Sequence, residues 1–275
     1  MTTLFTIPIS STRGSILCSN PAKAKGLDVD TEKVYILTFS SPPDNRLTPT
    51  FISAFLLALD IIEHRYPRGV VVSTSAIAKF YSNGLDLQLA QETEGFMEKY
   101  LWVLFRRLIT YPMPTISLLN GHAFAGGLMF AMYHDYRIMN PVKGFLCLNE
   151  IDFGVPLQTP MMSIFREKLT PATFRDLVLE ARRVPGPEAL ARGVVDGLGG
   201  LEEVVGFIAE RKLEGKARSG IYGVMKEEMY RGILGGLEDH EGNLGWRDRI
   251  EERKQVLEGE SERRVEAWER EKAKL

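Results

Sequence analysis

Three short segments of the sequence combine residue types that can do chemistry at the points where predicted strands end. They are FYSNGLDL at 80–87, NGHAFAGG at 120–127 and LNEIDFG at 148–154. Glycines between small polar residues let a backbone turn sharply, so that its N–H groups can approach a ligand closely. In the second segment the small residues also begin a predicted helix, whose first N–H groups are unpaired and carry positive potential. Because open α/β folds bind ligands at strand ends, these segments predict backbone donors beside the carboxylate of Glu150.

Each of these features also has a purely structural interpretation. The glycines of either loop, taken alone, are ordinary turn residues. Glu150 could be an ion-paired surface residue. However, burial of a carboxylate at the end of an apolar strand costs free energy, so a buried carboxylate there usually has a function. Asp152 is the rival candidate for a base, and Asp86 could simply cap a helix. The two loops, taken together beside Glu150, favour the functional interpretation.

The surrounding sequence predicts α/β elements that position these segments. Thr48-Pro49 has the form of a helix N-cap followed by proline in the first turn, and Pro67 and Gly69 end that helix. The run GVVVSTS at 69–75 is typical of a parallel strand that is buried on both faces. Further strands are predicted at 4–10, 33–40, 115–119, 136–139 and 145–148, and further helices at 92–110 and from 126. From 160 onward the sequence predicts helices, with starts at 170–171 and 185–187 and one short Val-Val strand within 193–200.

Composition limits the classes of protein to which the chain can belong. Its 275 residues include 34 Lys plus Arg and 36 Asp plus Glu, and the net charge of −2 offers no bulk attraction to nucleic acid. The two cysteines, Cys18 and Cys147, are too few for a disulfide framework. No apolar run approaches the roughly 18 residues of a membrane span. The four histidines lack metal-ligand spacing, so we expect no metal site. Dinucleotide, phosphate-loop and G-x-S-x-G motifs are missing as well.

The C-terminal end of the sequence has its own charge pattern. Residues 247–275 carry nine basic and nine acidic side chains, with apolar residues at loosely helical spacing. This pattern is typical of an exposed helix that side-chain ion pairs support. A partner-binding helix is the alternative, whereas nucleic-acid binding would need an excess of positive charge. We therefore expect an α/β core over residues 1–200 and a C-terminal helical region over 201–275.

Four motifs occur in order along the chain: F-x-S-N-G-L-D-L, N-G-H-A-x-A-G-G followed by H-D-Y-R-I-M, L-N-E-I-D-F-G-V-P-L, and A-L-A-R-G-V-V-D. Through them the sequence from about Lys33 to Val205 resembles the crotonase, or enoyl-CoA hydratase/isomerase, superfamily, and most of all its peroxisomal Δ3,Δ2-enoyl-CoA isomerase branch. The resemblance implies an α/β fold, a crotonase-like spiral of ββα units with a C-terminal helical trimerisation region. It also implies a homotrimer or hexamer and an acyl-CoA thioester substrate. No separate cofactor is expected, because coenzyme A is part of that substrate.

By position, the resemblance assigns the oxyanion hole to the backbone N–H groups of Leu85 and Gly126. Two such donors can each contribute about 3 to 4 kcal/mol to the stability of a developing enolate. The residues implied to bind substrate are Ser82, Asn83, Gly84, Asp86 and Gly127.

The acidic residues decide which reaction the resemblance implies. Hydratases of the family carry one glutamate three residues after the oxyanion glycine and a second at the position of Glu150, but this chain has Met129 at the first position. A single base is enough to remove a proton at C2 and return it at C4. The resemblance therefore implies a Δ3,Δ2-enoyl-CoA isomerase of fatty-acid β-oxidation with Glu150 as its base.

Two other functions stay open at this point. An enoyl-CoA hydratase or an acyl-CoA thioester hydrolase of the same fold would need a second carboxylate from elsewhere in the chain. A non-catalytic acyl-CoA-binding or scaffolding protein would use the charged C-terminal helix as its working part. Turnover of 3-enoyl-CoA separates these alternatives.

The chain ends in a small residue, a basic residue and leucine. Such an ending, here Ala273, Lys274 and Leu275, is of the kind that the peroxisomal import receptor reads when it is exposed. The resemblance to enzymes of β-oxidation points to the same compartment. The sequence therefore predicts a peroxisomal protein that binds this receptor.

Overall fold

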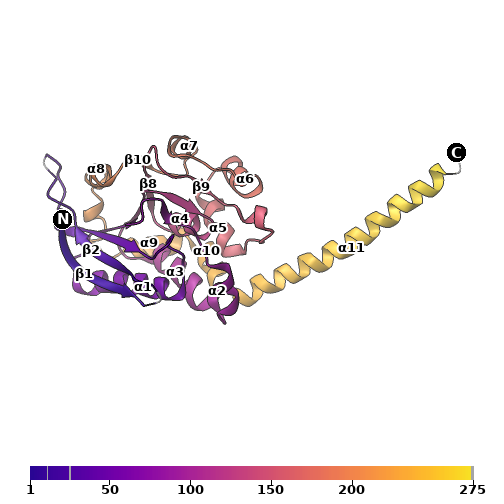
Figure 1. Cartoon of the computed structure of the whole chain (residues 1–275), viewed down its shortest axis with the longest axis horizontal. Coiled ribbons are helices and arrows are strands. Elements are labelled where there is room, and N and C mark those ends of the chain that lie inside the picture. The colour runs from indigo at the N-terminus through magenta and orange to yellow at the C-terminus, as the bar shows by residue number, and fades with distance from the viewer. Residues whose placement is uncertain (11, 25, 274–275) are drawn as a thin grey trace.

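A seven-stranded sheet forms the centre of the protein (Figure 1), in the order β1-β2-β3-β4-β6-β8-β10. The computed structural model describes residues 1–10, 12–24 and 26–273. The strands of this sheet are β1 (Thr2–Ile9), β2 (Gly14–Asn20), β3 (Val34–Ser40), β4 (Val70–Ser75), β6 (Thr115–Leu119), β8 (Tyr136–Met139) and β10 (Gly197–Leu198). The first three pair antiparallel, and from β3 onward each pair is parallel.

A second, smaller sheet contains three parallel strands, which are β5 (Phe80–Ser82), β7 (His122–Phe124) and β9 (Leu146–Cys147). Each of its strands directly follows a strand of the large sheet in the chain, so that β4-β5, β6-β7 and β8-β9 alternate between the two sheets before the chain enters helices. This ββα repeat confirms the predicted fold class. It also brings the three predicted functional segments side by side, because each contains a strand of the small sheet or directly follows one.

Several of the α-helices begin at a capping side chain. The α-helices are α1 (Pro49–Arg65), α2 (Leu87–Glu92), α3 (Trp102–Thr110), α4 (Gly126–Met132), α5 (Thr159–Lys168), α6 (Pro171–Leu179), α7 (Gly186–Ala191), α8 (Leu201–Arg211), α9 (Tyr222–Met229), α10 (Arg231–Glu238) and α11 (His240–Lys272). Short turns of other helix types are η1 (Thr31–Lys33), η2 (Met97–Leu101), η3 (Glu150–Phe153) and η4 (Leu213–Gly215). At α1 the Thr48 hydroxyl accepts the Phe51 N–H at 3.2 Å, which confirms the predicted N-cap.

Side chains alternate between two apolar cores along the large sheet. From β3, Tyr35, Leu37 and Phe39 enter the core that α1, α3 and α4 cover. Val34 and Ile36, which point the other way, pack in a second core with residues of α8. This two-residue period is the geometry of a strand that is buried on both faces. The sheet is therefore a rigid support between two layers of helices.

Strands β5 and β7 were not predicted, and three further details of the fold differ from the sequence-based expectations. Strand β2, at Gly14–Asn20, was not predicted, because glycine and serine residues interrupt its apolar run. The helix expected over 92–110 is divided, since α2 ends at Glu92 and Gly95 adopts a φ of +67° before the π-helical turn η2 begins. The short strand expected at two valines lies instead at Gly197–Leu198, while both valines are buried in the core.

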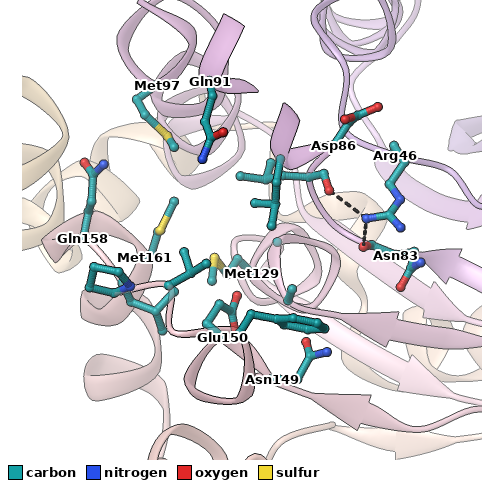
Figure 2. Close-up of a pocket in the computed structure, with 18 of the residues that line it drawn as sticks. Arg46, Asn83, Asp86, Gln91, Met97, Met129, Asn149, Glu150, Gln158 and Met161 are labelled. Atoms are coloured by element: carbon teal, nitrogen blue, oxygen red, sulfur yellow. Dashed lines mark hydrogen bonds between the residues drawn. The ribbon is translucent and has the colours of Figure 1, made fainter. Parts of the chain in front are cut away.

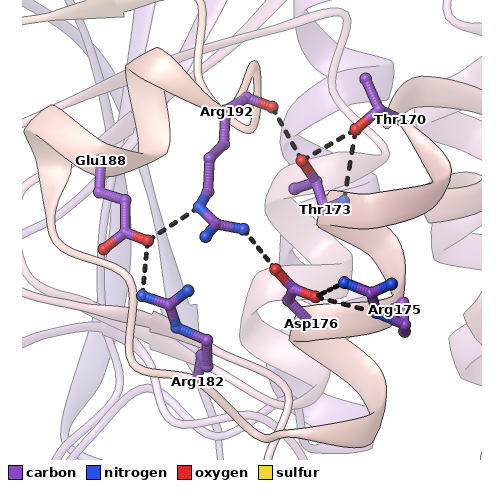
Figure 3. Close-up of polar contacts among 7 residues, drawn as sticks. All are labelled: Thr170, Thr173, Arg175, Asp176, Arg182, Glu188 and Arg192. Atoms are coloured by element: carbon purple, nitrogen blue, oxygen red, sulfur yellow. Dashed lines mark hydrogen bonds and ion pairs between the residues drawn. The ribbon is translucent and has the colours of Figure 1, made fainter.

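A network of charged side chains joins α6 to α7 (Figure 3). The carboxylate of Asp176 accepts hydrogen bonds from Arg192 at 2.7 Å and from Arg175 at 2.8 Å, which hold the pKa of Asp176 below its usual range. Glu188 accepts from Arg182 and Arg192, both at 2.8 Å. Because α6 also contacts η3, this network stabilises the surroundings of the turn that begins with Glu150.

The last helix, α11, extends away from the body of the protein (Figure 1), and none of its residues is buried. The preceding helices α8 and α10 do pack on the body, where Val204, Ile208 and Ile233 are buried. The division at residue 200 into a core and a helical region stays a prediction. Over the described ranges, no helix combines the length and the apolar character that crossing a membrane requires.

Candidate active site

The two predicted oxyanion-hole loops touch each other. Strands β5 and β7 are parallel neighbours, so the loops that follow them leave the small sheet at the same edge. Gly84 adopts a φ of +81°, and a Cβ added there would lie 2.9 Å from the Gly126 nitrogen. A Cβ added at Gly126 would in turn lie 3.4 Å from the Leu85 nitrogen. Glycine at position 84 therefore allows the two backbones to approach, so that the N–H groups of Leu85 and Gly126 lie near each other.

Both N–H groups are free to bind a ligand. Over the described ranges, neither the Leu85 nor the Gly126 N–H donates a hydrogen bond to another protein group. Gly126 is the first residue of α4, whose opening N–H groups have no partner within the helix. Ala125, directly before it, adopts a φ of +49° that turns the chain into the helix. Two neighbouring, unpaired donors of this kind fit an oxygen that carries negative charge.

These donors line a pocket of about 700 Å³ (Figure 2). The apolar part of its wall is formed by Leu85, Leu87, Met97, Ala125, Gly126, Met129, Phe153, Val155, Pro156, Leu157 and Met161. Its polar part is formed by Arg46, Asn83, Asp86, Gln91, Asn149, Glu150, Gln158 and Arg247. A mostly apolar cavity with a few polar groups is the usual form of a small-molecule site.

Glu150 lies in the wall of this pocket, at the start of η3 directly after β9 (Figure 2). Its Oε2 is buried and has no hydrogen-bond partner among the described residues. Burial raises the pKa of Glu150 from 4.5 to about 7, and its own backbone N–H lowers the pKa only in part. A carboxyl group with a pKa near neutrality can both take up and return a proton.

Two of the residues predicted to bind substrate, Asn83 and Asp86, line the pocket. Asp86 also caps α2 by accepting the Leu89 N–H at 3.1 Å. Its carboxylate lies near Arg46 at the upper right of Figure 2, whereas Glu150 lies near the bottom. The two acidic groups are therefore separated within the pocket.

The other three predicted residues lie behind the pocket wall. The Ser82 hydroxyl accepts the Gly84 N–H at 3.2 Å and donates to the Asn45 carbonyl at 2.7 Å. A Cβ added at Gly127 would lie 2.3 Å from the Ser82 carbonyl oxygen. In this structure Ser82, Gly84 and Gly127 thus shape the two loops and do not line the cavity.

Two further residues bear on the choice of reaction. Asp152, the rival base, is exposed and does not belong to the pocket wall. Met129, which stands where hydratases of the family carry a glutamate, does line the pocket and is only 1% exposed. The structure thus places a thioether, and not a second acid, at this position of the wall.

The segment directly before α1 contributes to the pocket, although no sequence motif predicted it. Asn45 is fully buried and donates to the Ser75 hydroxyl at 2.7 Å and to the Tyr81 carbonyl at 3.1 Å. Arg46 lines the pocket and donates to the carbonyl oxygens of the first oxyanion loop. The sequence signal was the polar run Asp-Asn-Arg between two prolines and a helix cap, which looks like an ordinary turn.

Three other pocket residues were not predicted either. Asn149 and Gln158 each have a buried side-chain oxygen without a hydrogen-bond partner among the described residues. Arg247 reaches the pocket from α11, a helix for which the charge pattern indicated only exposure. Asn149 lies inside the third motif, next to Glu150, but was assigned no role. No motif marks Gln158 or Arg247, because tertiary contacts alone bring them to the pocket. In the ranges that the structure covers, no group of three or more His, Cys, Asp or Glu side chains could hold a metal ion.

Comparison with known proteins agrees with this geometry. The family model for enoyl-CoA hydratase/isomerase matches residues 30–229. The chain is 33% identical over 213 residues to the peroxisomal enoyl-CoA delta isomerase 1 of Arabidopsis thaliana, covering 74% of this chain and 88% of that protein. It is 30% identical over 192 residues to the mitochondrial enoyl-CoA delta isomerase 1 of Rattus norvegicus, covering 68% of this chain and 63% of that protein.

A solved structure supports the fold. The crystal structure of a probable enoyl-CoA hydratase from Mycobacterium tuberculosis matches with a TM-score of 0.68, at 22% identity, over 85% of this chain and 98% of that one. At this identity the likeness concerns the fold alone. Because the family model matches most of this chain, the chain belongs to the enoyl-CoA hydratase/isomerase family.

Proposed function

We propose that the protein is a Δ3,Δ2-enoyl-CoA isomerase that converts 3-enoyl-CoA to trans-2-enoyl-CoA in fatty-acid β-oxidation. The observation that supports this most is the carboxylate of Glu150, whose buried Oε2 has no hydrogen-bond partner among the described residues, in the wall that also contains the two free N–H groups. Among the described residues of that wall, Asp86 is the only other acid, and it caps α2. One base beside one oxyanion hole is what a proton shift along the substrate requires.

The proposed reaction moves one proton and two electron pairs. The thioester oxygen accepts hydrogen bonds from the N–H groups of Leu85 and Gly126, which makes the C2 proton more acidic. Glu150 removes this proton, and the electrons form an enolate whose charge the two donors stabilise, by about 3 to 4 kcal/mol each. The protonated Glu150 then delivers the same proton to C4. The double bond moves from C3–C4 to C2–C3, where it is conjugated with the thioester, and no atom is gained or lost.

Met129 favours isomerisation over hydration. Hydration adds water across the double bond, and a water molecule needs polar partners to hold and activate it. The buried Met129 side chain offers no such partner at the position that a hydratase uses. Hydratase and thioester hydrolase activities therefore have less support from this pocket.

Purified protein tests the proposal directly. Mixed with 3-enoyl-CoA, it should form the conjugated 2-enoyl thioester, which ultraviolet absorbance detects. Rapid hydration of 2-enoyl-CoA, or release of free coenzyme A, would show that the isomerase assignment is wrong. Binding of acyl-CoA without turnover of any of these substrates would favour the non-catalytic alternative.

The rate of isomerisation should rise with pH through the pKa of the base. Glu150 acts only as a carboxylate, and its pKa in the free protein is raised to about 7. We therefore expect kcat/KM to increase tenfold per pH unit below pH 7 and to level off above it. The pH profile of kcat/KM measures this. A rate that is independent of pH between 5 and 8 would contradict Glu150 as the base.

We also propose that the protein works in the peroxisome and reaches it through its last three residues. The small-basic-leucine ending supports this, although Lys274 and Leu275 lie outside the residues that the structure describes. The Arabidopsis relative is named peroxisomal, whereas the rat relative is named mitochondrial. An exposed helix, α11, precedes the ending, which is the accessibility that a receptor needs.

Removal of this ending should abolish import. A tagged protein that lacks Ala273, Lys274 and Leu275 should stay in the cytosol, while the full chain should colocalise with a peroxisomal marker. Fluorescence microscopy of the two forms makes the comparison. Peroxisomal import of the shortened form would exclude the tripeptide as the signal.

Assembly is a further part of the proposal. The family resemblance supports a homotrimer or a hexamer of the 31.0 kDa chain. Light scattering on the purified protein distinguishes the two, and a monomeric mass would contradict both.

A further inference from the structure

The first oxyanion loop is held from outside by the four residues Asp44-Asn45-Arg46-Leu47. The Leu47 N–H donates to the Gly84 carbonyl at 2.9 Å. The Arg46 Nη1 donates to the Leu85 carbonyl at 2.7 Å and to the Asn83 carbonyl at 3.1 Å, and Figure 2 shows both bonds. Three consecutive carbonyl groups of the loop are thus fixed by two adjacent residues of another segment.

This arrangement determines where the Leu85 N–H points. The Gly84 carbonyl and the Leu85 N–H belong to one planar, trans peptide group, so they point in opposite directions. Because Leu47 holds the carbonyl side, the N–H side faces away from the 44–47 segment. The carbonyl groups before and after this peptide are bonded to Arg46, which limits rotation of the peptide plane.

The Arg46 side chain is itself held in place. Its Nε donates to the Asp44 carboxylate at 3.0 Å, and the same carboxylate oxygen accepts from the Asn83 amide at 2.6 Å. A guanidinium group presents its donors in a rigid, planar fork, so one side chain can bind a carboxylate and two carbonyl groups at once. A lysine ammonium at this position would lack that fixed geometry.

We propose that Arg46 is a positioning residue of the oxyanion hole, which acts on the Leu85 N–H through the backbone of residues 83–85. This inference rests on the proposed function, because it assumes that the Leu85 N–H binds the thioester oxygen. Arg46 does not take part in proton transfer. A displacement of a reacting group by about 1 Å can lower a rate 10²-fold. Loss of the hydrogen bonds from Arg46 should therefore lower kcat by a larger factor than it lowers the affinity for substrate.

The competing role for Arg46 is a direct contact with the phosphates of coenzyme A, because its side chain is 37% exposed and lines the pocket. The two roles predict different measurements. A phosphate contact affects the affinity for every acyl-CoA and leaves the reacting carbonyl group unchanged. A positioning role affects the polarisation of that carbonyl group, and the affinity changes little.

The test compares the full-length wild type with Arg46→Met and Arg46→Lys. In Arg46→Met we expect kcat to fall by about 10- to 10²-fold, while the Kd for octanoyl-CoA, a saturated thioester that cannot react, changes less than about threefold. The carbonyl stretching frequency of bound octanoyl-CoA, read by isotope-edited infrared spectroscopy, should move toward its value in water. Arg46→Lys should give intermediate values. Arg65→Met is the matched control, since Arg65 is exposed and, among the described residues, donates only to the neighbouring His64 carbonyl.

Two results would overturn the proposal. One is an unchanged kcat and carbonyl frequency in Arg46→Met, and the other is a loss of octanoyl-CoA affinity that accounts for the whole effect. If Arg46→Met does not fold, Asp44→Asn removes the negative charge that holds the Arg46 guanidinium and should show the same changes to a smaller extent. The infrared measurement needs no turnover, so it separates this inference from the proposed reaction. If the carbonyl stretching frequency of octanoyl-CoA shifts on binding to the wild type but the protein has no isomerase activity, the proposed reaction alone is contradicted. If the frequency does not shift on binding, the protein has no oxyanion hole, and the proposed role of Arg46 is contradicted as well.

Discussion

Replacement of Glu150 by glutamine should lower kcat for isomerisation of 3-enoyl-CoA by at least 10²-fold, the usual contribution of a general base. Glutamine keeps the size of the side chain but cannot take up the C2 proton. The Oε2 atom of Glu150 is buried in the pocket wall and has no hydrogen-bond partner among the described residues, so no neighbouring group is positioned to replace the carboxylate. The rate at which the conjugated thioester forms is the measurement.

Asp152→Asn is the matched control for this variant. Asp152 lies two residues from Glu150, but its side chain is exposed and does not line the pocket. We expect its replacement to leave kcat within about twofold of the wild type, since surface changes away from a site are usually nearly neutral. The reverse result, an active Glu150→Gln and an inactive Asp152→Asn, would identify Asp152 as the base.

Replacement of Glu150 by glutamine should also make the folded protein more stable above neutral pH. The pKa of Glu150 is raised from 4.5 to about 7 by burial, so the folded protein holds this proton more tightly than the unfolded chain. The stabilisation is complete below pH 4.5 and is lost as pH rises through 7. At pH 8 Glu150→Gln avoids burying the charge, which is worth on the order of 3 kcal/mol of unfolding free energy. Denaturant unfolding at pH 4 and pH 8 should show a gain at pH 8 alone.

The sequence predicted the main parallel strands and the first helix because these elements carry local sequence signals. The buried parallel strands β4, β6 and β8 are short apolar runs between clear breaks, and α1 has both a cap and a stop. Strand β2 carries a weaker signal, because glycine and serine residues interrupt its apolar run, although it pairs with the neighbouring strand β1. The division of the 92–110 helix depends on one glycine, Gly95, whose positive φ the helical periodicity does not reveal.

The candidate site shows the same contrast. Leu85, Gly126 and Glu150 were assigned by their positions in motifs, and the structure places all three in one pocket wall. Arg46 and Arg247 also line that pocket, but they come from an apparent turn and from a charged helix. Their places are set by packing between distant segments, which no local pattern records.

Replacement of Gly84 by alanine should have an effect comparable to the loss of an oxyanion donor, a fall in kcat of about 10²- to 10³-fold. The new Cβ would lie 2.9 Å from both the Gly126 nitrogen and the Phe124 carbonyl oxygen. Both atoms belong to the backbone, so neither can move away without shifting its loop. The two loops must therefore separate, and the N–H groups of Leu85 and Gly126 lose the convergent geometry that holds one oxygen.

Gly193→Ala separates this effect from backbone strain. Gly193 has a φ of +70°, close to the +81° of Gly84, but a Cβ added there meets no atom within 4 Å. Both alanine variants should lose about 1 to 2 kcal/mol of stability from the left-handed backbone, as thermal unfolding would show. Only Gly84→Ala should lose activity, because only there does the methyl group enter the contact between the two loops. Wild-type kcat in a folded Gly84→Ala variant would mean that this contact does not form the oxyanion hole.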